Sequence, residues 1–282
     1  MTRPYSRTIA LIGGTGLAAG LRNLPLSDPR LHQNVTVRFG ATSARVLEYI
    51  EGYCGNLRVI VLPRHGPTLE RPDRSPATLV AEHGYEAHIW LFHELGVSAV
   101  YAFSTVGALD LDVPLASRLA FVVPHDYGRG VGATTHSFGS LSKTIHPSMG
   151  EPFDAHSRAK AIAAIEASGA TALTRGLYIY NGPDQFETDA EIRAIRRFYE
   201  GESHRIVGMT AGPEVVLCRQ MDIPYAVVCA NSNYAQGVLE DVSVTHELVL
   251  HEMKPATTKM LEIAGHLIRI VAAEPVLGDP AT

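Results

Sequence analysis

Two glycine-rich segments in the second half of the chain bring together an aromatic ring, a carboxylate, a thioether and a hydroxyl. Residues 181–188 have the sequence NGPDQFET, and residues 208–210 have the sequence GMT. A ring such as that of Phe186 can stack on a flat base. The Glu187 carboxylate can accept a hydrogen bond from a base N–H, and the Met209 thioether can pack against a sugar. This combination of residue types suits a purine nucleoside.

Phe186 and Glu187 also have a structural interpretation. Thr188 followed by Asp189-Ala190-Glu191 is typical of a capped helix start. Phe186 would then be a core aromatic, and Glu187 an acid near the start of that helix. The sequence leaves both interpretations open.

The segment Gly13–Leu17, with the sequence GGTGL, could hold a phosphate. Glycines let the backbone approach a ligand closely, and exposed N–H groups and the Thr15 hydroxyl can donate to phosphate oxygens. The same region formally fits the dinucleotide fingerprint GxGxxA, from Gly14 to Ala19. That fingerprint also needs an acid about 20 positions later, whereas Asp28 comes too early and stands among prolines. A glycine turn that binds nothing is the third alternative.

Polar residues follow three further apolar runs of the chain. Arg64 could grip two phosphate oxygens and His65 could add a third donor. Ser104 and Thr105 supply hydroxyls, and Asn233 supplies an amide suited to a base edge. The structural alternatives are a surface arginine with a capping histidine, a helix cap and a polar turn.

The runs that precede these residues predict buried strands. They are short and continuously apolar, at residues 8–12, 59–63, 99–103 and 225–230. In open α/β sheets the ligand lies outside the carboxyl ends of the strands. The pattern therefore predicts an α/β protein, a mixed sheet flanked by helices, with one site at one edge of the sheet.

The remaining chain supports a single domain over residues 1–282. Residues 67–82 are rich in proline and charge and predict a loop or lid. We see no internal repeat, low-complexity tract or clear linker. Helical patterns are expected at residues 86–95, 157–168, 190–197 and 246–273.

The composition excludes several classes of protein. With 46% apolar and 19% charged residues, the 282-residue chain has the composition of an ordinary soluble globular protein. A net charge of −5 gives no basic footprint for nucleic acid and no polybasic membrane patch. No apolar run approaches about 18 residues, no signal-peptide core is apparent, and the three cysteines fit no zinc pattern. We expect a cytoplasmic protein without a metal, a nucleic-acid partner or a membrane partner.

In their order along the chain, these segments resemble the trimeric purine nucleoside phosphorylase and methylthioadenosine phosphorylase family. Gly13–Leu17 resembles the family's first phosphate loop, with Thr15 as the phosphate hydroxyl. Arg64-His65-Gly66 resembles its second phosphate element. Ser104–Leu109 is similar to its T-x-x-G-S-L segment, which implies Ser104 at the phosphate.

Two further segments bear on the sugar and the assembly. Gly208–Val215 matches the family closely, which implies Met209 on the ribose and Thr210 on phosphate. Residues 146–153 resemble a segment from which family members lend a histidine to the neighbouring subunit's site. The resemblance therefore implies a homotrimer in which His146 approaches a neighbour's substrate.

Three residues bear on the substrate. Asparagine at position 233 resembles the 6-oxopurine enzymes of the family, whereas the adenine-specific methylthioadenosine branch carries aspartate there. Glu187 resembles the glutamate that holds the N1 edge of the base in the 6-oxopurine branch. His246 resembles the histidine that this branch uses on the 5′-hydroxyl.

The chain departs from the family pattern in three places. Glu86 replaces the usual arginine or glutamine of the segment N-Y-R/Q-A-N-I-W. The chain between Gly66 and Tyr85 is several residues longer than in a typical methylthioadenosine phosphorylase. One extra residue separates Pro183 from Phe186. These departures bear on the 5′-substituent and the base.

The reaction that the resemblance implies is phosphorolysis of a purine nucleoside to a free purine and ribose 1-phosphate. Asn233 and Glu187 would stabilise the leaving purine, and inorganic phosphate would be the co-substrate, with no organic cofactor. The alternatives are a 5′-methylthioadenosine or methylthioinosine phosphorylase, a hydrolytic nucleosidase and a non-catalytic nucleoside-binding paralogue. A dinucleotide-dependent oxidoreductase would rest on the GxGxxA pattern alone.

Overall fold

The structure of the protein is a computed structural model that describes residues 7–14, 17, 20, 23–66, 74–240 and 242–275. Within these residues, eleven strands form one mixed sheet. The strands are β1 (Arg7–Gly13), β2 (Ser27–Phe39), β3 (Thr42–Cys54), β4 (Leu57–Pro63), β5 (Ala99–Ala108), β6 (Ala120–Val122), β7 (Asp126–Arg129), β8 (Thr171–Leu173), β9 (Leu177–Tyr180), β10 (Arg205–Gly208) and β11 (Tyr225–Tyr234). The helices are α2 (Pro76–Ala81), α3 (Gly84–Glu94), α4 (Ala155–Ala167), α5 (Asp189–Phe198), α6 (Ala211–Gln220) and α7 (His246–Ala273), with 3-10 turns η1 (Ala116–Arg118) and η2 (Gly139–Leu141).

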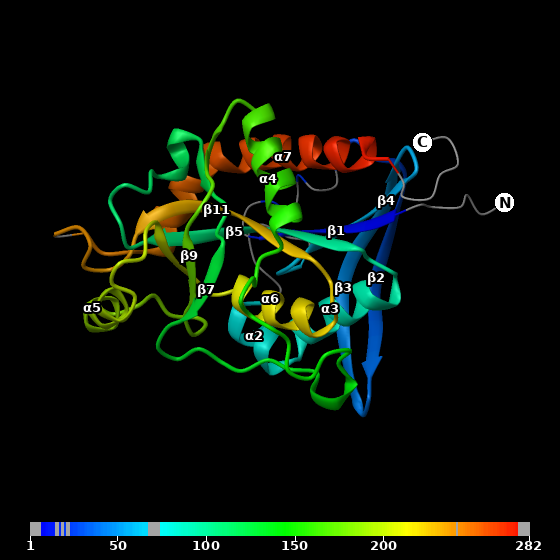
Figure 1. Cartoon of the computed structure of the whole chain (residues 1–282), viewed down its shortest axis with the longest axis horizontal. Coiled ribbons are helices and arrows are strands. Elements are labelled where there is room, and N and C mark those ends of the chain that lie inside the picture. The colour runs from blue at the N-terminus through cyan, green and yellow to red at the C-terminus, as the bar shows by residue number, and fades with distance from the viewer. Residues whose placement is uncertain are drawn as a thin grey trace.

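The centre of the sheet consists of the four predicted strands. β1 pairs in parallel with β4 and β5, and β5 pairs in parallel with β11. Their apolar residues are buried on both faces of the sheet, as expected for parallel strands covered by helices. Helices α4 and α7 lie on one side of the strands and α2, α3 and α6 on the other (Figure 1). The predicted α/β fold is therefore confirmed.

Two of the central strands extend further than the sequence predicts. β5 continues through Ser104 and Thr105 to Ala108, and β11 continues through Asn233 to Tyr234. The pairing of β11 with β5 shifts register between Asn231 and Asn233, which marks a β-bulge. Because a bulge changes the direction of the side chains that follow it, it sets the orientation of Asn233.

The predicted helices are all present, with small shifts at their ends. α5 begins after Thr188, whose hydroxyl accepts from the Glu191 N–H while the Glu191 carboxylate accepts from the Thr188 N–H. This capping box confirms the predicted helix start, with Glu187 just before the cap. The paired 13-residue strands β2 and β3 were not predicted.

The predicted loop or lid at 67–82 is only partly described. Residues 67–73 lie outside the described residues. The rest contains the helix α2, capped by the Ser75 hydroxyl, which accepts from the Thr78 N–H at 3.2 Å. None of the helices that the structure describes is long and apolar enough to cross a bilayer.

Candidate active site

A cavity of about 400 Å³ opens where the parallel strands bring the predicted polar residues together. Gly13 and Pro63 are register partners at the ends of β1 and β4, so Gly14 and His65 meet at the same edge. β5 and β11 continue past this edge and supply further wall residues. The cavity is lined by Gly13, Gly14, His65, Gly66, Arg74, Ser75, Pro76, Thr105, Val106, Gly107, Asp184, Gln185, Phe186, Glu187, Val207, Gly208, Met209, Thr210, Ser232, Asn233, His246, Val249 and Leu250.

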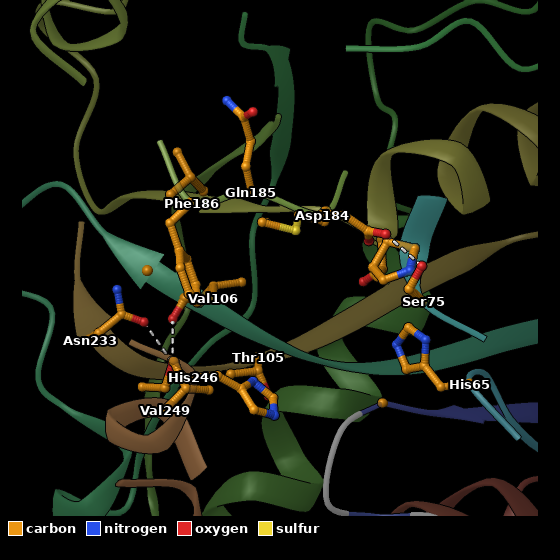
Figure 2. A pocket seen from close by; sticks show the side chains of 18 of the residues that line it. His65, Ser75, Thr105, Val106, Asp184, Gln185, Phe186, Asn233, His246 and Val249 are labelled. Carbon is orange, nitrogen blue, oxygen red and sulfur yellow. Dashed lines mark hydrogen bonds between the residues drawn. The ribbon is translucent and has the colours of Figure 1, made fainter. Parts of the chain in front are cut away.

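Most of the predicted site residues lie on this wall, although they come from positions as far apart as 65 and 246. Figure 2 shows Asn233 and Phe186 on one side of the cavity and His65 on the other. The predicted residues on the wall are His65, Thr105, Phe186, Glu187, Met209, Thr210, Asn233 and His246. Thr15 lies outside the described residues.

Glu187 is a buried carboxylate on the wall of the cavity. It is held by the Asn181 amide, whose Nδ2 donates to Glu187 Oε1 at 3.3 Å. Burial raises the pKa of Glu187, and hydrogen bonds from its backbone and from Asn181 offset only part of that effect. A carboxylate placed in this way can accept a hydrogen bond from a ligand N–H that replaces lost water.

Asn233 lies just after the bulge of β11 with its amide fixed at both ends. Its Nδ2 donates to the Tyr234 carbonyl at 3.0 Å, and its Oδ1 accepts from the Ser232 hydroxyl at 2.8 Å. A Cβ on Gly107 would stand only 3.0 Å from Asn233 Nδ2, so glycine leaves room for this amide. One N–H and one lone pair of the amide remain for a ligand.

Hydroxyl groups lie on β5 and at the start of α6. The Thr105 Oγ1 is buried at the wall and has no hydrogen-bond partner within the described part of the chain. Thr210 is on the wall, and its Oγ1 lies 3.2 Å from the Oγ of Ser104, which is buried behind it. A buried hydroxyl without a partner is costly, so Thr105 is suited to donate to an anionic ligand.

Arg64 differs from the expected geometry. Its Nε and Nη2 donate to the two carboxylate oxygens of Glu214, and Nη1 donates to the Phe103 carbonyl at 3.1 Å. Arg64 is almost fully buried and does not line the cavity. We predicted that the guanidinium of Arg64 binds two phosphate oxygens, but Glu214 occupies the Nε and Nη2 edge of that group. The structure therefore does not have the predicted two-oxygen contact. A contact to phosphate stays a prediction that rests on Nη1, close to Gly14.

His65 faces the cavity as a neutral imidazole. Its Nδ1 is 2.9 Å from the Arg74 carbonyl, which can only accept, so Nδ1 carries the proton. Burial and the nearby Arg64 charge lower the pKa of His65 to about 4. The Nε2 of this neutral imidazole is thus an acceptor, whereas we predicted a donor. It becomes a donor only with a second proton, which a bound anion favours.

Two other residues singled out in the sequence lie away from the cavity. His146 is exposed on the loop before α4, which is anchored at the far end of α6 by contacts to Arg219 and Gln220. Glu86 is buried in α3, where its Oε1 pairs with His136 Nδ1 at 3.0 Å. Glu86 is thus part of a buried network and is not on the wall formed by the described residues.

The wall also includes residues for which the sequence suggested no role. Ser75 and Asp184 form a hydrogen bond beside His65, and Val249 and Leu250 follow His246 on the first turns of α7. Val249 and Leu250 come three and four residues after His246 in the predicted helix, so helical spacing could have placed them on the same face as His246. Nothing local in the sequence links Ser75 to Asp184.

Comparison with known proteins identifies the family of the chain. The sequence model of the phosphorylase superfamily matches residues 8–269, a span that includes all the residues lining the cavity. The chain belongs to the phosphorylase superfamily. A probable S-methyl-5′-thioinosine phosphorylase of Methanopyrus kandleri is 29% identical over 90% of this chain and 90% of its own length. An S-methyl-5′-thioadenosine phosphorylase of Hyperthermus butylicus is 32% identical over 95% of this chain and 89% of its own.

The fold is also found among solved structures. The methylthioadenosine phosphorylase of Schistosoma mansoni in complex with adenine has a TM-score of 0.75 to this superfamily member at 22% identity. The match covers 95% of this chain and 93% of the other. The family suggested by the sequence motifs is confirmed.

Proposed function

We propose that this protein is a purine nucleoside phosphorylase, a pentosyltransferase that acts on 6-oxopurine nucleosides. It transfers the pentosyl group from the purine to inorganic phosphate, giving a free purine and ribose 1-phosphate. The observation that carries the proposal is the meeting of the Asn233 amide and the buried Glu187 carboxylate on the wall of one cavity. Phe186 on the same wall offers a face for stacking on the base.

The base side of the cavity favours a 6-oxopurine. The free N–H of Asn233 can donate to O6, and its remaining lone pair can accept from a protonated N7. Glu187 can accept the N1–H that a 6-oxopurine carries. An adenine instead presents a lone pair at N1 to that carboxylate, and two acceptors facing each other in a desolvated site are unfavourable.

The other side of the cavity supports phosphate as the second substrate. Thr105 and Thr210 present hydroxyls, Gly14 allows close approach to the backbone, and His65 gains a proton as an anion binds. Arg64 contributes positive charge from behind the wall. These groups would hold phosphate close to C1′ of the nucleoside.

Catalysis in this proposal comes from positioning and electrostatics. The bond from C1′ to the base breaks first, and C1′ becomes oxocarbenium-like before phosphate bonds to it. Asn233 donates to O6 as the purine gains negative charge, and it accepts from N7 once that nitrogen has taken a proton from solvent. Glu187 accepts the N1–H and holds the base in place. Phosphate held in place beside C1′ captures the sugar, and Met209 shapes the ribose site. No protein nucleophile is needed.

The 5′-substituent has two candidates. His246 can hydrogen bond to a 5′-hydroxyl, whereas Val249 and Leu250 offer an apolar surface for a 5′-methylthio group. The relatives named for methylthioinosine and methylthioadenosine support the second candidate. Methylthioinosine combines the apolar 5′-group with a 6-oxopurine base.

We also propose that the protein is a cytoplasmic homotrimer. His146 is exposed and lies apart from the cavity of its own chain, as expected for a residue that serves a neighbouring subunit. The apolar side chains of Leu141 and Ile145 are exposed close to it in sequence. Cys54, Cys218 and Cys229 are free thiols, which suits a reducing compartment.

The test is a panel of nucleosides assayed with and without phosphate. Inosine, adenosine and their 5′-methylthio analogues should be cleaved only when inorganic phosphate is present, with ribose 1-phosphate or its 5′-methylthio form as product. Equal cleavage in phosphate-free buffer would instead indicate a hydrolytic nucleosidase. No cleavage of any of the nucleosides would indicate a binding protein.

A further inference from the structure

Ser75 and Asp184 are 109 residues apart in the chain and hydrogen bonded at the wall of the cavity (Figure 2). The Ser75 hydroxyl donates to Asp184 Oδ2 at 2.6 Å, and the Ala77 N–H donates to Asp184 Oδ1 at 3.1 Å. Both carboxylate oxygens are thus held at the start of α2. These two hydrogen bonds join the loop between β9 and α5 to the start of α2.

Arg74, the residue before Ser75, is hydrogen bonded to His65 on the proposed phosphate side of the cavity. The Arg74 N–H donates to the His65 carbonyl at 3.1 Å, and His65 Nδ1 donates to the Arg74 carbonyl at 2.9 Å. His65 directly follows Arg64, whose N–H donates to the Gly13 carbonyl at 2.9 Å, so its backbone is anchored to the sheet. Residues 74 and 75 therefore connect His65 with Asp184.

Asp184 in turn determines where the base-binding residues stand. Its φ angle is +66°, in the left-handed region that residues with a side chain enter at a cost and that Asp and Asn tolerate best. The contacts with Ser75 and Ala77 offset this cost. Because Phe186 and Glu187 follow within three residues, their positions depend on the conformation of Asp184.

We propose that Asp184 is a positioning residue that couples the purine site to the phosphate site through Ser75. The inference rests on the proposed function for the identity of the two ligands. Phosphate at His65 orders residues 74 and 75, these hold Asp184, and Asp184 holds Phe186 and Glu187 in place for the base. Coupling between two binding sites is reciprocal, so each ligand strengthens the binding of the other.

The coupling can be measured as a ratio of dissociation constants. The Kd of hypoxanthine is determined by calorimetry with and without saturating inorganic phosphate. In the unmodified protein we expect phosphate to tighten hypoxanthine binding about fivefold or more, within the usual range for coupled sites. Asp184→Ala should bring the ratio close to one, and Ser75→Ala should lower it in part because the Ala77 contact remains.

Two matched variants separate positioning from general stability. Asp184→Asn keeps an acceptor for the Ala77 N–H and a polar group for Ser75, so it should retain most of the coupling. Asp154→Ala removes another carboxylate at a helix start, which accepts from the Ser157 N–H at 2.7 Å outside the cavity wall. It should leave the ratio unchanged. Melting curves confirm that each variant is folded.

The outcomes distinguish this inference from the proposed function. Coupling that persists in folded Asp184→Ala, or that Asp154→Ala weakens equally, would overturn the role of Asp184. Phosphate-dependent turnover with no coupling in the unmodified protein would overturn the inference and leave the proposed function standing. If the unmodified protein does not bind phosphate, both the inference and the proposed function are wrong.

Discussion

Arg64 and Glu214 form a buried ion pair between the end of β4 and the first turn of α6. Arg64 Nη2 donates to Glu214 Oε2 at 3.0 Å, and the two side chains are only 1% and 0% exposed. The Tyr225 hydroxyl also donates to Glu214 Oε2, at 2.7 Å. Burial alone would lower the pKa of Arg64, but the charge and hydrogen bonds of Glu214 outweigh this effect and raise it. The pair holds the start of α6, and with it Thr210, against the end of β4.

Arg64→Met is expected to lower both stability and phosphate use. It leaves Glu214 as a buried charge without its partner, which costs about 3–5 kcal/mol of the free energy of unfolding. It also removes the positive charge behind the cavity, so phosphate-limited kcat/KM should fall on the order of a hundredfold. Urea denaturation and steady-state kinetics measure the two effects.

The double variant Arg64→Met/Glu214→Gln separates these effects. The glutamine that replaces Glu214 carries no charge and can still accept from the Tyr225 hydroxyl, so most of the lost stability should return. The phosphate-limited efficiency should not return. Recovery of both would show that Arg64 serves the fold alone.

The contrast between Arg64 and Glu214 shows what a sequence can and cannot predict here. An apolar run followed by Arg64 is a local pattern, and parallel pairing of β4 with β1 places it beside Gly14. The partner Glu214 is 150 residues away, and no local pattern records such a pair. The sequence therefore placed Arg64 near the site but could not show that its guanidinium faces Glu214.

Strand ends were mispredicted for a related reason. The segment from Asn231 to Asn233 has the composition of a polar turn, yet it lies in β11 because it pairs with β5 through a bulge. Pairing with a neighbouring strand overrides the local preference of Asn and Ser for turns. Four of the strands were predictable because their short apolar runs are unbroken, and the helix α7 because its apolar pattern is long and regular.

Asn181 and Glu187 should determine how kcat/KM falls at the acid end of its pH profile. Glu187 must be ionised to accept a base N–H, so kcat/KM should fall as the pH drops through its raised pKa. Asn181→Ala removes a donor that stabilises the ionised form, so the pKa of Glu187 should rise further. The acid limb should then move to higher pH.

The measurement is kcat/KM against pH for the unmodified protein and the variant. Gln220→Ala, which removes a buried amide at the other end of α6, is the control and should leave the limb in place. A limb that stays fixed in Asn181→Ala would mean that another group controls it.

Buried histidines should make the protein sensitive to acid. Burial and the charges of Arg74, Arg64 and His65 lower the pKa of His88 to about 3. The unfolded chain binds a proton at this histidine below about pH 6.5, whereas the folded chain does not until about pH 3. Stability is therefore lost as the pH falls below about 6.5, at up to about 1.4 kcal/mol per pH unit for this group.

Urea denaturation at pH 7.5 and pH 5 measures this dependence. His88→Leu should reduce the loss of stability between the two conditions. His251→Gln changes a histidine that is largely exposed and should leave the loss unchanged. An equal loss in His88→Leu and the unmodified protein would assign the acid sensitivity to other groups.

The proposed trimer predicts complementation between subunits. The unmodified protein should be a trimer by light scattering at micromolar concentration. His146→Ala and Glu187→Ala should each lower activity. If His146 serves a neighbour's site, trimers mixed from both variants contain some sites with neither substitution and regain part of the activity. A fully active monomer would exclude the arrangement.

The base preference depends on the Asn233 amide and the Glu187 carboxylate acting on one purine. We expect inosine and methylthioinosine to be turned over with higher kcat/KM than the matching adenosines, by about ten- to a hundredfold. That range corresponds to roughly 1–3 kcal/mol for a buried polar group left without its partner. Asn233→Asp offers an acceptor to a 6-amino group and should erode or reverse the preference. Part of its effect will be lost stability, because the new carboxylate oxygen can face the Tyr234 carbonyl, which accepts from Asn233 Nδ2 at 3.0 Å.

Glu187→Gln tests the same preference from the other end of the base. The glutamine amide can donate to the N1 lone pair of adenine. The variant should therefore have a higher kcat/KM for adenosine, relative to that for inosine, without any change at Asn233. Both variants are compared with the unmodified protein by the ratio of kcat/KM for inosine to that for adenosine. If the unmodified protein turns over the adenines faster, the 6-oxopurine assignment is wrong and a methylthioadenosine phosphorylase takes its place.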